Sequence, residues 1–149
     1  MNTLLFLTTL LSAVCLSWAA SDEYKMKVIT AVTSCAKDHG ANIMDVIEVV
    51  KADKLPTNKA QKCVAGCFFN KMGYVTDHKV DWAKVKALNP KKYESKDLIA
   101  KADKVADACA KVVTQKITDV CELGIPPMKC LIEESKKIQL PKPDIKFKF

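Results

Sequence analysis

The sequence predicts an all-α domain: a compact bundle of six short helices, cross-linked by three disulfides and followed by an extended C-terminal tail. Three observations predict it. Apolar residues recur at helical spacing through most of the chain. The chain has only 4 glycines, and its 6 prolines fall at the edges of the periodic stretches. Six cysteines remain once an N-terminal export signal is set aside, an even set typical of a disulfide-linked exported domain.

The N-terminal segment has the pattern of an export signal. Residues 1–20 carry no charged side chain, and an apolar run extends from Leu4 to Leu16. Ser17-Trp18-Ala19 then provides small residues at the −3 and −1 positions of a cleavage after Ala19. This predicts a secretory signal peptide over residues 1–19, because the apolar run is shorter than the roughly 20 residues of a membrane span. Cleavage removes Cys15 and leaves residues 20–149 as one secreted, extracellular domain.

The first two helices are predicted from apolar stripes between recognisable end signals. The first follows Asp22 and ends at Gly40, since glycine readily adopts the left-handed conformation that terminates helices. Asn42 can cap the second helix, because its side-chain oxygen can accept a hydrogen bond from a free amide of the first turn. The second helix stops before Leu55-Pro56.

The third and fourth helices follow the same logic. The third begins at Thr57 or Asn58 and closes at Gly73. Asp81 begins the fourth, which runs through Leu88 and is ended by Asn89-Pro90.

The fifth helix is the longest, and the sixth is followed by a change in character. Ser95 caps the fifth helix, which extends to about Lys116. Pro126-Pro127 opens the sixth, because proline is tolerated in the first turn. After Ile138, two prolines forbid helix, and apolar residues alternate with lysines in the extended tail, residues 141–149.

The six cysteines are separated by 27, 3, 41, 11 and 8 residues. The close pair, Cys63 and Cys67, stands at i, i+4 spacing, so both sulfurs leave one face of one helix. Such a pair is poorly placed to bond to itself, so we expect this helix to be linked to two other segments. The six cysteines are Cys35, Cys63, Cys67, Cys109, Cys121 and Cys130.

The formal net charge is +7, and all 24 basic residues are lysines. The absence of arginine argues against nucleic-acid recognition, which relies on the guanidinium fork. Scattered lysines are typical of a solvated surface, and they also permit attraction to anionic lipid, glycan or an acidic partner. A cationic membrane-active or defence protein is therefore the alternative function. It is disfavoured because the helix stripes contain cysteines and must face a core.

No catalytic, cofactor or metal site is predicted. A secreted helical phospholipase would need a calcium loop and a Cys-Cys-His-Asp helix, and neither appears in the sequence. The chain also has no Gly-x-Ser-x-Gly turn, the motif of the serine hydrolases. Cys63, Cys67 and His78 could in principle hold zinc, but export favours oxidised sulfur.

The cysteine pattern resembles that of the insect odorant-binding proteins, the pheromone- and general odorant-binding group of six-cysteine type. Three residues separate the second and third cysteines and eight separate the fifth and sixth, as in that family. The resemblance covers the whole mature chain. It implies the disulfides Cys35–Cys67, Cys63–Cys121 and Cys109–Cys130, one of 15 possible pairings that spacing alone leaves open.

The resemblance also implies a function. The family carries small hydrophobic molecules such as odorants and pheromones through sensillum lymph or another body fluid, inside an apolar cavity that the helices enclose. Small hydrophobic ligands are thus the expected partners. An olfactory receptor, a membrane surface and a weak homodimer are further candidate partners, and nucleic acid is not.

Apolar residues on the predicted stripes are candidates for the cavity wall. Of the neighbours Phe68 and Phe69, one is expected to face inward and the other outward, and Tyr74 could donate a hydrogen bond to a ligand oxygen. The candidate lining residues are Val32, Met44, Ile47, Phe68, Phe69, Met72, Tyr74, Leu88, Ile99, Val105, Val113, Leu131, Ile132, Phe147 and Phe149.

Two further features bear on ligand release. Ile145, Phe147 and Phe149 share one face of the tail, which could lie across the cavity as a lid. His39 and His78 are candidate pH switches, but their expected loop positions favour solvated surface residues.

Overall fold

The structure is a computed structural model that describes residues 20–147 of the chain. The predicted signal peptide and Phe149 lie outside these residues. The elements, in chain order, are α1 (Asp22–Asp38), α2 (Ile43–Lys51), α3 (Lys59–Lys71), β1 (Val75–Thr76), β2 (Lys79–Val80), α4 (Trp82–Ala87), α5 (Asn89–Lys92), α6 (Lys96–Val112), α7 (Val120–Leu123) and α8 (Ile125–Lys137).

The all-α prediction is confirmed, and the six predicted helices correspond to α1, α2, α3, α4, α6 and α8. The expected caps of three of them form: Asn42, Asn58 and Asp81 each accept a backbone N–H of the following first turn. Gly40 and Gly73 have positive φ angles of 63° and 78° at the ends of α1 and α3.

Two single-turn helices, α5 and α7, were not predicted. In α5, Pro90 lies in the first turn of a new helix instead of only ending α4, because its fixed φ suits the start of a helix. In α7, Asp119 caps the turn by accepting from the Cys121 amide.

The fifth predicted helix, α6, ends at Val112 and not near Lys116, so its predicted end was wrong. The Val113 carbonyl accepts a hydrogen bond from the Trp82 indole at 3.3 Å. The Ile117 amide donates to the His78 carbonyl at 2.8 Å. These tertiary hydrogen bonds replace the helical ones, and the β-branched pair Val112-Val113 weakens helix formation at this point.

A two-residue hairpin turn joins β1 and β2, which pair antiparallel. Its turn residues Asp77 and His78 both have positive φ, as a type I′ turn requires. The sequence lacks the Asn-Gly or Asp-Gly signal that would have predicted this turn.

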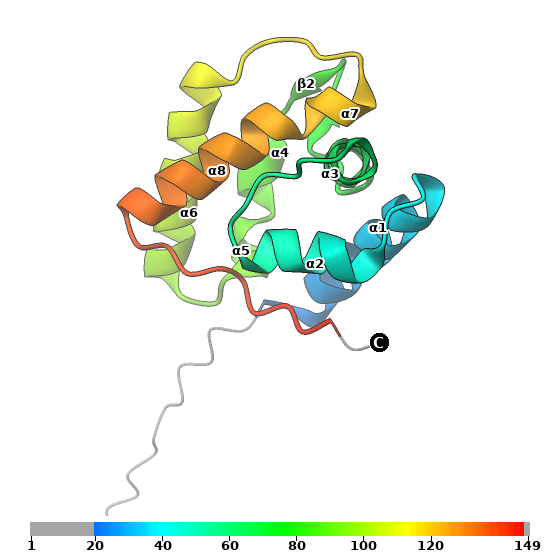
Figure 1. The fold of residues 1–149 in the computed structure, drawn as a ribbon. Helices are drawn as coiled ribbons and strands as arrows, with labels where there is room; N and C mark the ends of the chain where they lie inside the picture. The colour runs from blue at the N-terminus through cyan, green and yellow to red at the C-terminus, as the bar shows by residue number, and fades with distance from the viewer. Residues whose placement is uncertain (1–19, 148–149) are drawn as a thin grey trace, which may run out of the picture.

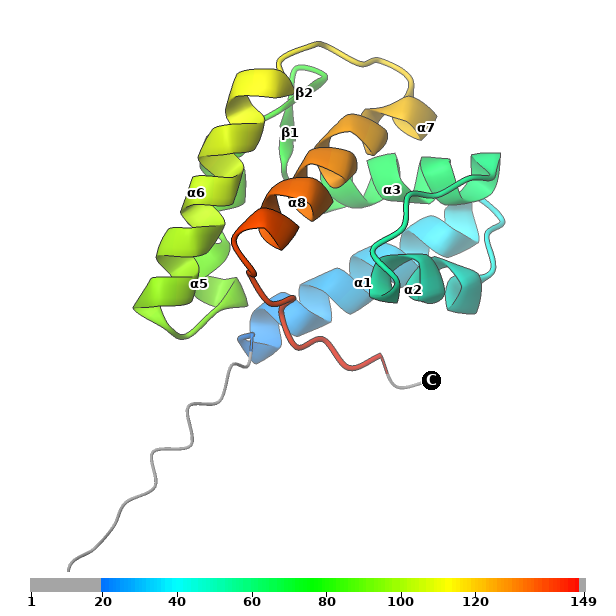
Figure 2. The ribbon, with the colours of Figure 1, turned by 60° about the vertical axis from the view of Figure 1, so that its left-hand side comes forward.

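Figures 1 and 2 show the arrangement of the helices, and three disulfides join them. Cys35–Cys67 links α1 to α3, Cys63–Cys121 links α3 to α7, and Cys109–Cys130 links α6 to α8. This is the pairing that the family resemblance implies. The helix that carries Cys63 and Cys67 is linked to two different segments, as their spacing predicts. Cys35 and Cys109 are fully buried.

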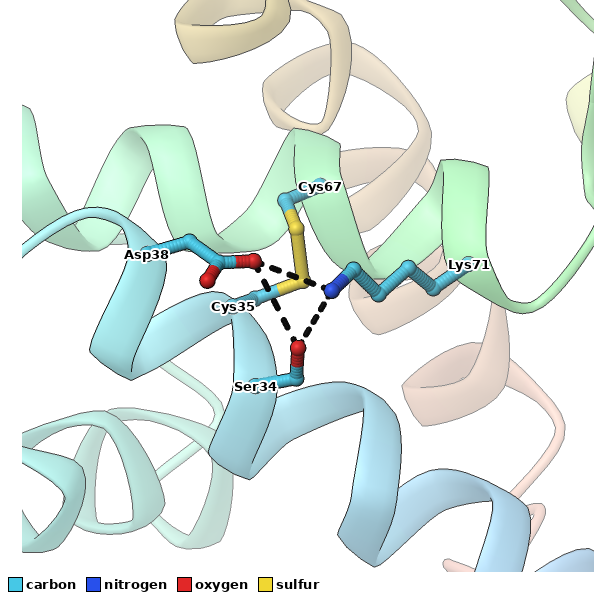
Figure 3. The surroundings of a disulfide bond; sticks show 5 residues. All are labelled: Ser34, Cys35, Asp38, Cys67 and Lys71. Atoms are coloured by element: carbon cyan, nitrogen blue, oxygen red, sulfur yellow. Dashed lines mark hydrogen bonds and ion pairs between the residues drawn. A yellow bond between two sulfur atoms is a disulfide. The ribbon is translucent and has the colours of Figure 1, made fainter.

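Figure 3 shows the surroundings of the Cys35–Cys67 disulfide, where α1 and α3 cross. The Lys71 ammonium of α3 reaches Asp38 of α1 at 3.0 Å and also donates to Ser34. These groups are exposed, so the ion pair adds little stability. The disulfide itself holds the crossing.

Two glycines let α3 approach α7 and the start of α8 closely. A Cβ on Gly66 would overlap the carbonyl of Val120, and one on Gly124 would stand 2.6 Å from the Gly66 amide nitrogen. Real Cβ atoms do not approach backbone this closely. This contact lies one turn from the Cys63–Cys121 disulfide, so backbone packing and cross-link depend on each other.

We predict that Gly66→Ala destabilises the protein. Helix propensity alone would make alanine stabilising by about 1 kcal/mol, whereas the overlap with Val120 should cost at least about 2 kcal/mol. Urea unfolding of the oxidised protein measures the sign. Ala100→Gly, at an exposed position inside α6, is the control that reports helix propensity. A stabilised Gly66→Ala variant would contradict this close approach.

Candidate functional site

A cavity of about 760 Å³ lies between the helices and the C-terminal tail. Its volume is within the range of small-molecule sites. Its wall is mostly aliphatic and aromatic, drawn from α1, α2, α3, α4, α6, α8 and the tail. The apolar side chains of the wall include Val28, Val32, Val46, Ile47, Val64, Phe68, Phe69, Val85, Ala102, Val105, Met128, Leu131, Ile132, Leu140, Ile145 and Phe147.

The structure brings most of the predicted lining residues together around this cavity. They come from helices far apart in the chain, because the predicted stripes of α1, α2, α3, α6 and α8 converge on it. The predicted residues that line it are Val32, Ile47, Phe68, Phe69, Tyr74, Val105, Leu131, Ile132 and Phe147.

Met44 and Met72 do not line the cavity, and both expectations are corrected. Met44 is in the first turn of α2 with 52% of its surface exposed. It shares the helix with Ile47 but faces away from the bundle. Met72 is 1% exposed at the end of α3 and packs in the core.

Leu88, Ile99 and Val113 also lie elsewhere. Leu88, between α4 and α5, packs against the main core from outside the cavity. Ile99 packs on a smaller cluster that contains Tyr93. Val113 is buried beyond the end of α6, beside the Trp82 hydrogen bond.

Phe68 and Phe69 both border the cavity, so the expectation that one of them faces outward is corrected. Their rings meet edge to face with centres 6.1 Å apart. Tyr74 turns back after Gly73 and contacts both rings edge to face. Neighbouring helical positions can share a cavity because the space extends along the side of α3.

Polar side chains gather at one part of the wall, which we call the polar corner: Tyr24, Tyr74, Asn89 and Lys92. Asn89 is 2% exposed, and its amide donates to the Asp103 carboxylate at 2.7 Å. The Lys92 ammonium donates to the Asn89 side-chain oxygen at 3.0 Å and to the Val85 carbonyl at 3.5 Å. The same ammonium lies 5.2 Å from the centre of the Tyr74 ring.

The two tyrosine hydroxyls of the polar corner are 3.5 Å apart. Burial raises the pKa of Tyr24 well above its ordinary value, with a further contribution from the Tyr74 hydroxyl, and raises the pKa of Tyr74 to about 12. Burial also lowers the pKa of Lys92 to about 8, against a smaller opposite effect of Asp103.

The first turn of α1 is fixed beside α5 because the Ser21 amide donates to the Lys91 carbonyl at 2.8 Å.

The tail beyond α8 borders the cavity and is held at several points. The Lys142 ammonium donates to the carbonyls of Val50 and Lys51 at 3.0 and 2.6 Å, at the end of α2, and pairs with Asp53 at 2.8 Å. A cation suits this position because the last carbonyls of a helix lack intrahelical donors. Figures 1 and 2 both show the tail running from the end of α8 to α2.

The apolar face of the tail turns inward. Ile145 and Phe147 line the cavity and are half-buried, whereas Lys146 between them is exposed. The Tyr93 hydroxyl donates to the Pro141 carbonyl at 2.8 Å. The tail is therefore part of the wall.

Of the polar corner, the sequence indicated only Tyr74. Asn89-Pro90 marks the predicted end of the fourth helix, although proline is also favoured in the first turn of a helix such as α5. Nothing in the sequence separates Lys92 from the other lysines. His39 ends α1 and His78 is in the hairpin turn, and neither lines the cavity.

Cys63 and Cys67, which were considered as zinc ligands, are bound in disulfides. Within residues 20–147, no group of three or more histidine, cysteine or acidic side chains could hold a metal ion. In the same part of the chain, no helix has the length and apolar character needed to cross a membrane.

Comparison with known proteins decides the family. The profile of the PBP/GOBP family matches residues 17–134, most of the chain. The chain belongs to this family. A search of curated protein sequences gives no match.

Two solved members of the odorant-binding group share the fold. Odorant-binding protein dmelOBP28a from Drosophila melanogaster aligns with a TM-score of 0.66 and 21% identity over 80% of this chain and 98% of its own. Odorant Binding Protein 7 from Anopheles gambiae has four disulfide bridges and was solved in complex with an azo compound. It aligns with a TM-score of 0.59 and 22% identity over 78% of this chain and 89% of its own. At this identity the likeness concerns the fold.

The lowered pKa of Lys92 predicts a pH dependence of stability. In the folded protein, loss of solvation disfavours the charged form of Lys92 and lowers the free energy of unfolding. This destabilisation is complete below about pH 8 and disappears as the pH rises towards 10.5, the ordinary pKa of lysine. Relative to Lys92→Met, the wild-type protein should therefore gain roughly 2 kcal/mol of unfolding free energy between about pH 7 and 10.

Urea unfolding at a series of pH values measures this difference, and the other lysines cancel because both proteins contain them. Tyr24 and Tyr74 do not interfere below about pH 10, because their raised pKa values affect stability only at higher pH. Parallel pH profiles for the two proteins would show that the Lys92 ammonium keeps its solvation in the folded protein.

Proposed function

We propose that this chain is a secreted carrier that reversibly binds small hydrophobic molecules in its internal cavity and transports them through aqueous extracellular fluid. The observation that carries the proposal is the cavity of about 760 Å³, walled by aliphatic and aromatic side chains from six helices and the tail. Moving an apolar ligand from water into such a space is favourable in proportion to the apolar area removed from water.

Family membership supports the proposal, since the family is that of the odorant-binding proteins. The Anopheles gambiae neighbour was solved in complex with an azo compound. Secretion is supported by the pattern of residues 1–19, which is typical of a signal peptide. Odorants, pheromones and similar signalling molecules are the ligand classes that the family suggests.

We expect the mature oxidised protein to bind the apolar fluorescent probe N-phenyl-1-naphthylamine saturably, with a Kd on the order of micromolar. Apolar alcohols, esters and aldehydes should displace it competitively. Titration of probe fluorescence measures both effects. Linear, unsaturable fluorescence would contradict the carrier function. Leakage of anionic vesicles at the same protein concentrations, without saturable binding, would favour the cationic membrane-active alternative.

The tail is proposed to act as a lid over the cavity. Deleting residues 141–149 should increase the dissociation rate of the probe by roughly tenfold or more, because Ile145 and Phe147 leave the wall. Lys142→Ala should have a smaller effect in the same direction, roughly threefold, because the tail would lose its attachment to α2. Stopped-flow displacement measures these rates.

The control for Lys142→Ala is Lys146→Ala, which removes the same charge from an exposed residue of the tail whose ion pair with Asp144 is long, at 3.8 Å. This variant should release the probe at the wild-type rate. Equal release rates for the wild-type and the deleted protein would show that the tail is not a lid.

A further inference from the structure

The polar corner is the part of the cavity wall that a carrier of purely apolar molecules does not need. Lys92 presents an ammonium group to an apolar space, and its partners are neutral. They are the side-chain oxygen of Asn89, the carbonyl of Val85 and the ring of Tyr74, whose centre is 5.2 Å away. Within the described part of the chain, Lys92 makes no direct ion pair. Lys92 is half-buried, and a cation that is withdrawn from water is normally compensated by an anion or by several strong acceptors.

The nearest carboxylate does not fill this role from within the cavity. Asp103 reaches Lys92 only through the amide of Asn89, and it is not among the residues that line the cavity. The one carboxylate of the described lining, Asp53, is paired with Lys142 beside the tail. The lining otherwise contains the lysines Lys51, Lys92 and Lys136, so its charge balance is positive.

The unused hydrogen-bond donors of the polar corner also indicate a ligand group that accepts hydrogen bonds. An ammonium has three N–H donors, and the two hydrogen bonds of Lys92 leave one for a ligand. The hydroxyls of Tyr24 and Tyr74 share one contact, which uses one of their two O–H donors and leaves the other. The polar corner therefore offers a cationic N–H and a neutral O–H, both of which require an acceptor.

We propose that the polar corner binds the carboxylate head group of a ligand whose apolar chain fills the cavity, as in a fatty acid. The proposal rests on the carrier function proposed above and specifies its ligand class. One carboxylate oxygen accepts from Lys92, and a tyrosine hydroxyl donates to the head group. Asn89 acts as a positioning residue, because it fixes the ammonium of Lys92 and is itself fixed by Asp103.

The test compares dodecanoate with 1-dodecanol and methyl dodecanoate, which have the same apolar chain but no negative charge. Each displaces N-phenyl-1-naphthylamine from the oxidised protein at about pH 7. The readout is the affinity for dodecanoate relative to that for dodecanol. Charge-assisted hydrogen bonds predict that Lys92→Met lowers this ratio roughly tenfold to a hundredfold, mainly through weaker binding of dodecanoate.

Two further variants make the result specific. Lys92→Gln keeps a hydrogen-bond donor without the charge, and it should also lower the ratio. Lys136→Met removes the same charge from an exposed lysine of the lining, and it should leave the ratio within about threefold of the wild-type value. Binding of dodecanol by each variant shows that its cavity is intact.

The outcomes separate the two proposals. If the probe and dodecanol bind but Lys92→Met leaves the ratio unchanged, the carboxylate subsite is wrong and the carrier function stands. If Lys136→Met lowers the ratio instead, the head group lies beside the tail and the assignment to the polar corner is overturned. If neither probe nor dodecanol binds, the carrier function itself fails.

Discussion

The two disulfides of α3 are the constraint on which the rest of the structure depends. Cys63 and Cys67 leave one face of this helix one turn apart, and they bind α7 and α1 respectively. The third disulfide joins α6 to α8, two helices that both contribute to the cavity wall. The three disulfides join cysteines that are 32, 58 and 21 residues apart in the chain. In the chain-entropy model, each cross-link over a loop of this size stabilises the folded state by roughly 3–4 kcal/mol.

This constraint explains how a small domain keeps a cavity. A domain of this size has a total stability of only about 5–15 kcal/mol, and an empty apolar space forfeits the packing contacts that would otherwise contribute to it. The cross-links limit the unfolded chain and fix the helices at their crossings. The aliphatic side chains can therefore line a space of about 760 Å³ instead of packing against one another.

Much of the fold could be predicted because its signals are local. The stripes, caps and prolines specify the six longer helices, and the i, i+4 spacing of Cys63 and Cys67 indicates that α3 is linked to two segments. The early end of α6 could not be predicted, because it depends on the Trp82 indole, which lies 31 residues away in the chain. The complete pairing of the cysteines required the family resemblance.

The cavity wall was predictable only in part, for a physical reason. Periodicity identifies the buried face of a helix but does not distinguish a residue that borders a cavity from one that packs against another helix. Ile47 and Met44 belong to the same amphipathic helix, yet only Ile47 reaches the cavity. Lys92 has no local signature, because the two tyrosines of its surroundings, Tyr24 and Tyr74, come from distant parts of the chain.

The polar corner changes how the cavity is understood. An apolar cavity selects ligands mainly by size and apolar area, and such selection is weak. A cation beside two hydroxyls adds a requirement for an acceptor at one end of the ligand. Withdrawing the Lys92 ammonium from water costs free energy, and so does withdrawing an anionic head group. Bringing the two together in the cavity lets each charge compensate the other.

The most direct test of the central claim is binding of N-phenyl-1-naphthylamine before and after complete reduction and alkylation of the cysteines, with helix content followed by circular dichroism. If the cross-links hold the cavity open, saturable binding should disappear in the alkylated protein, even if much of its helical structure persists. Unchanged affinity with all six cysteines alkylated would show that the cavity does not depend on the disulfides.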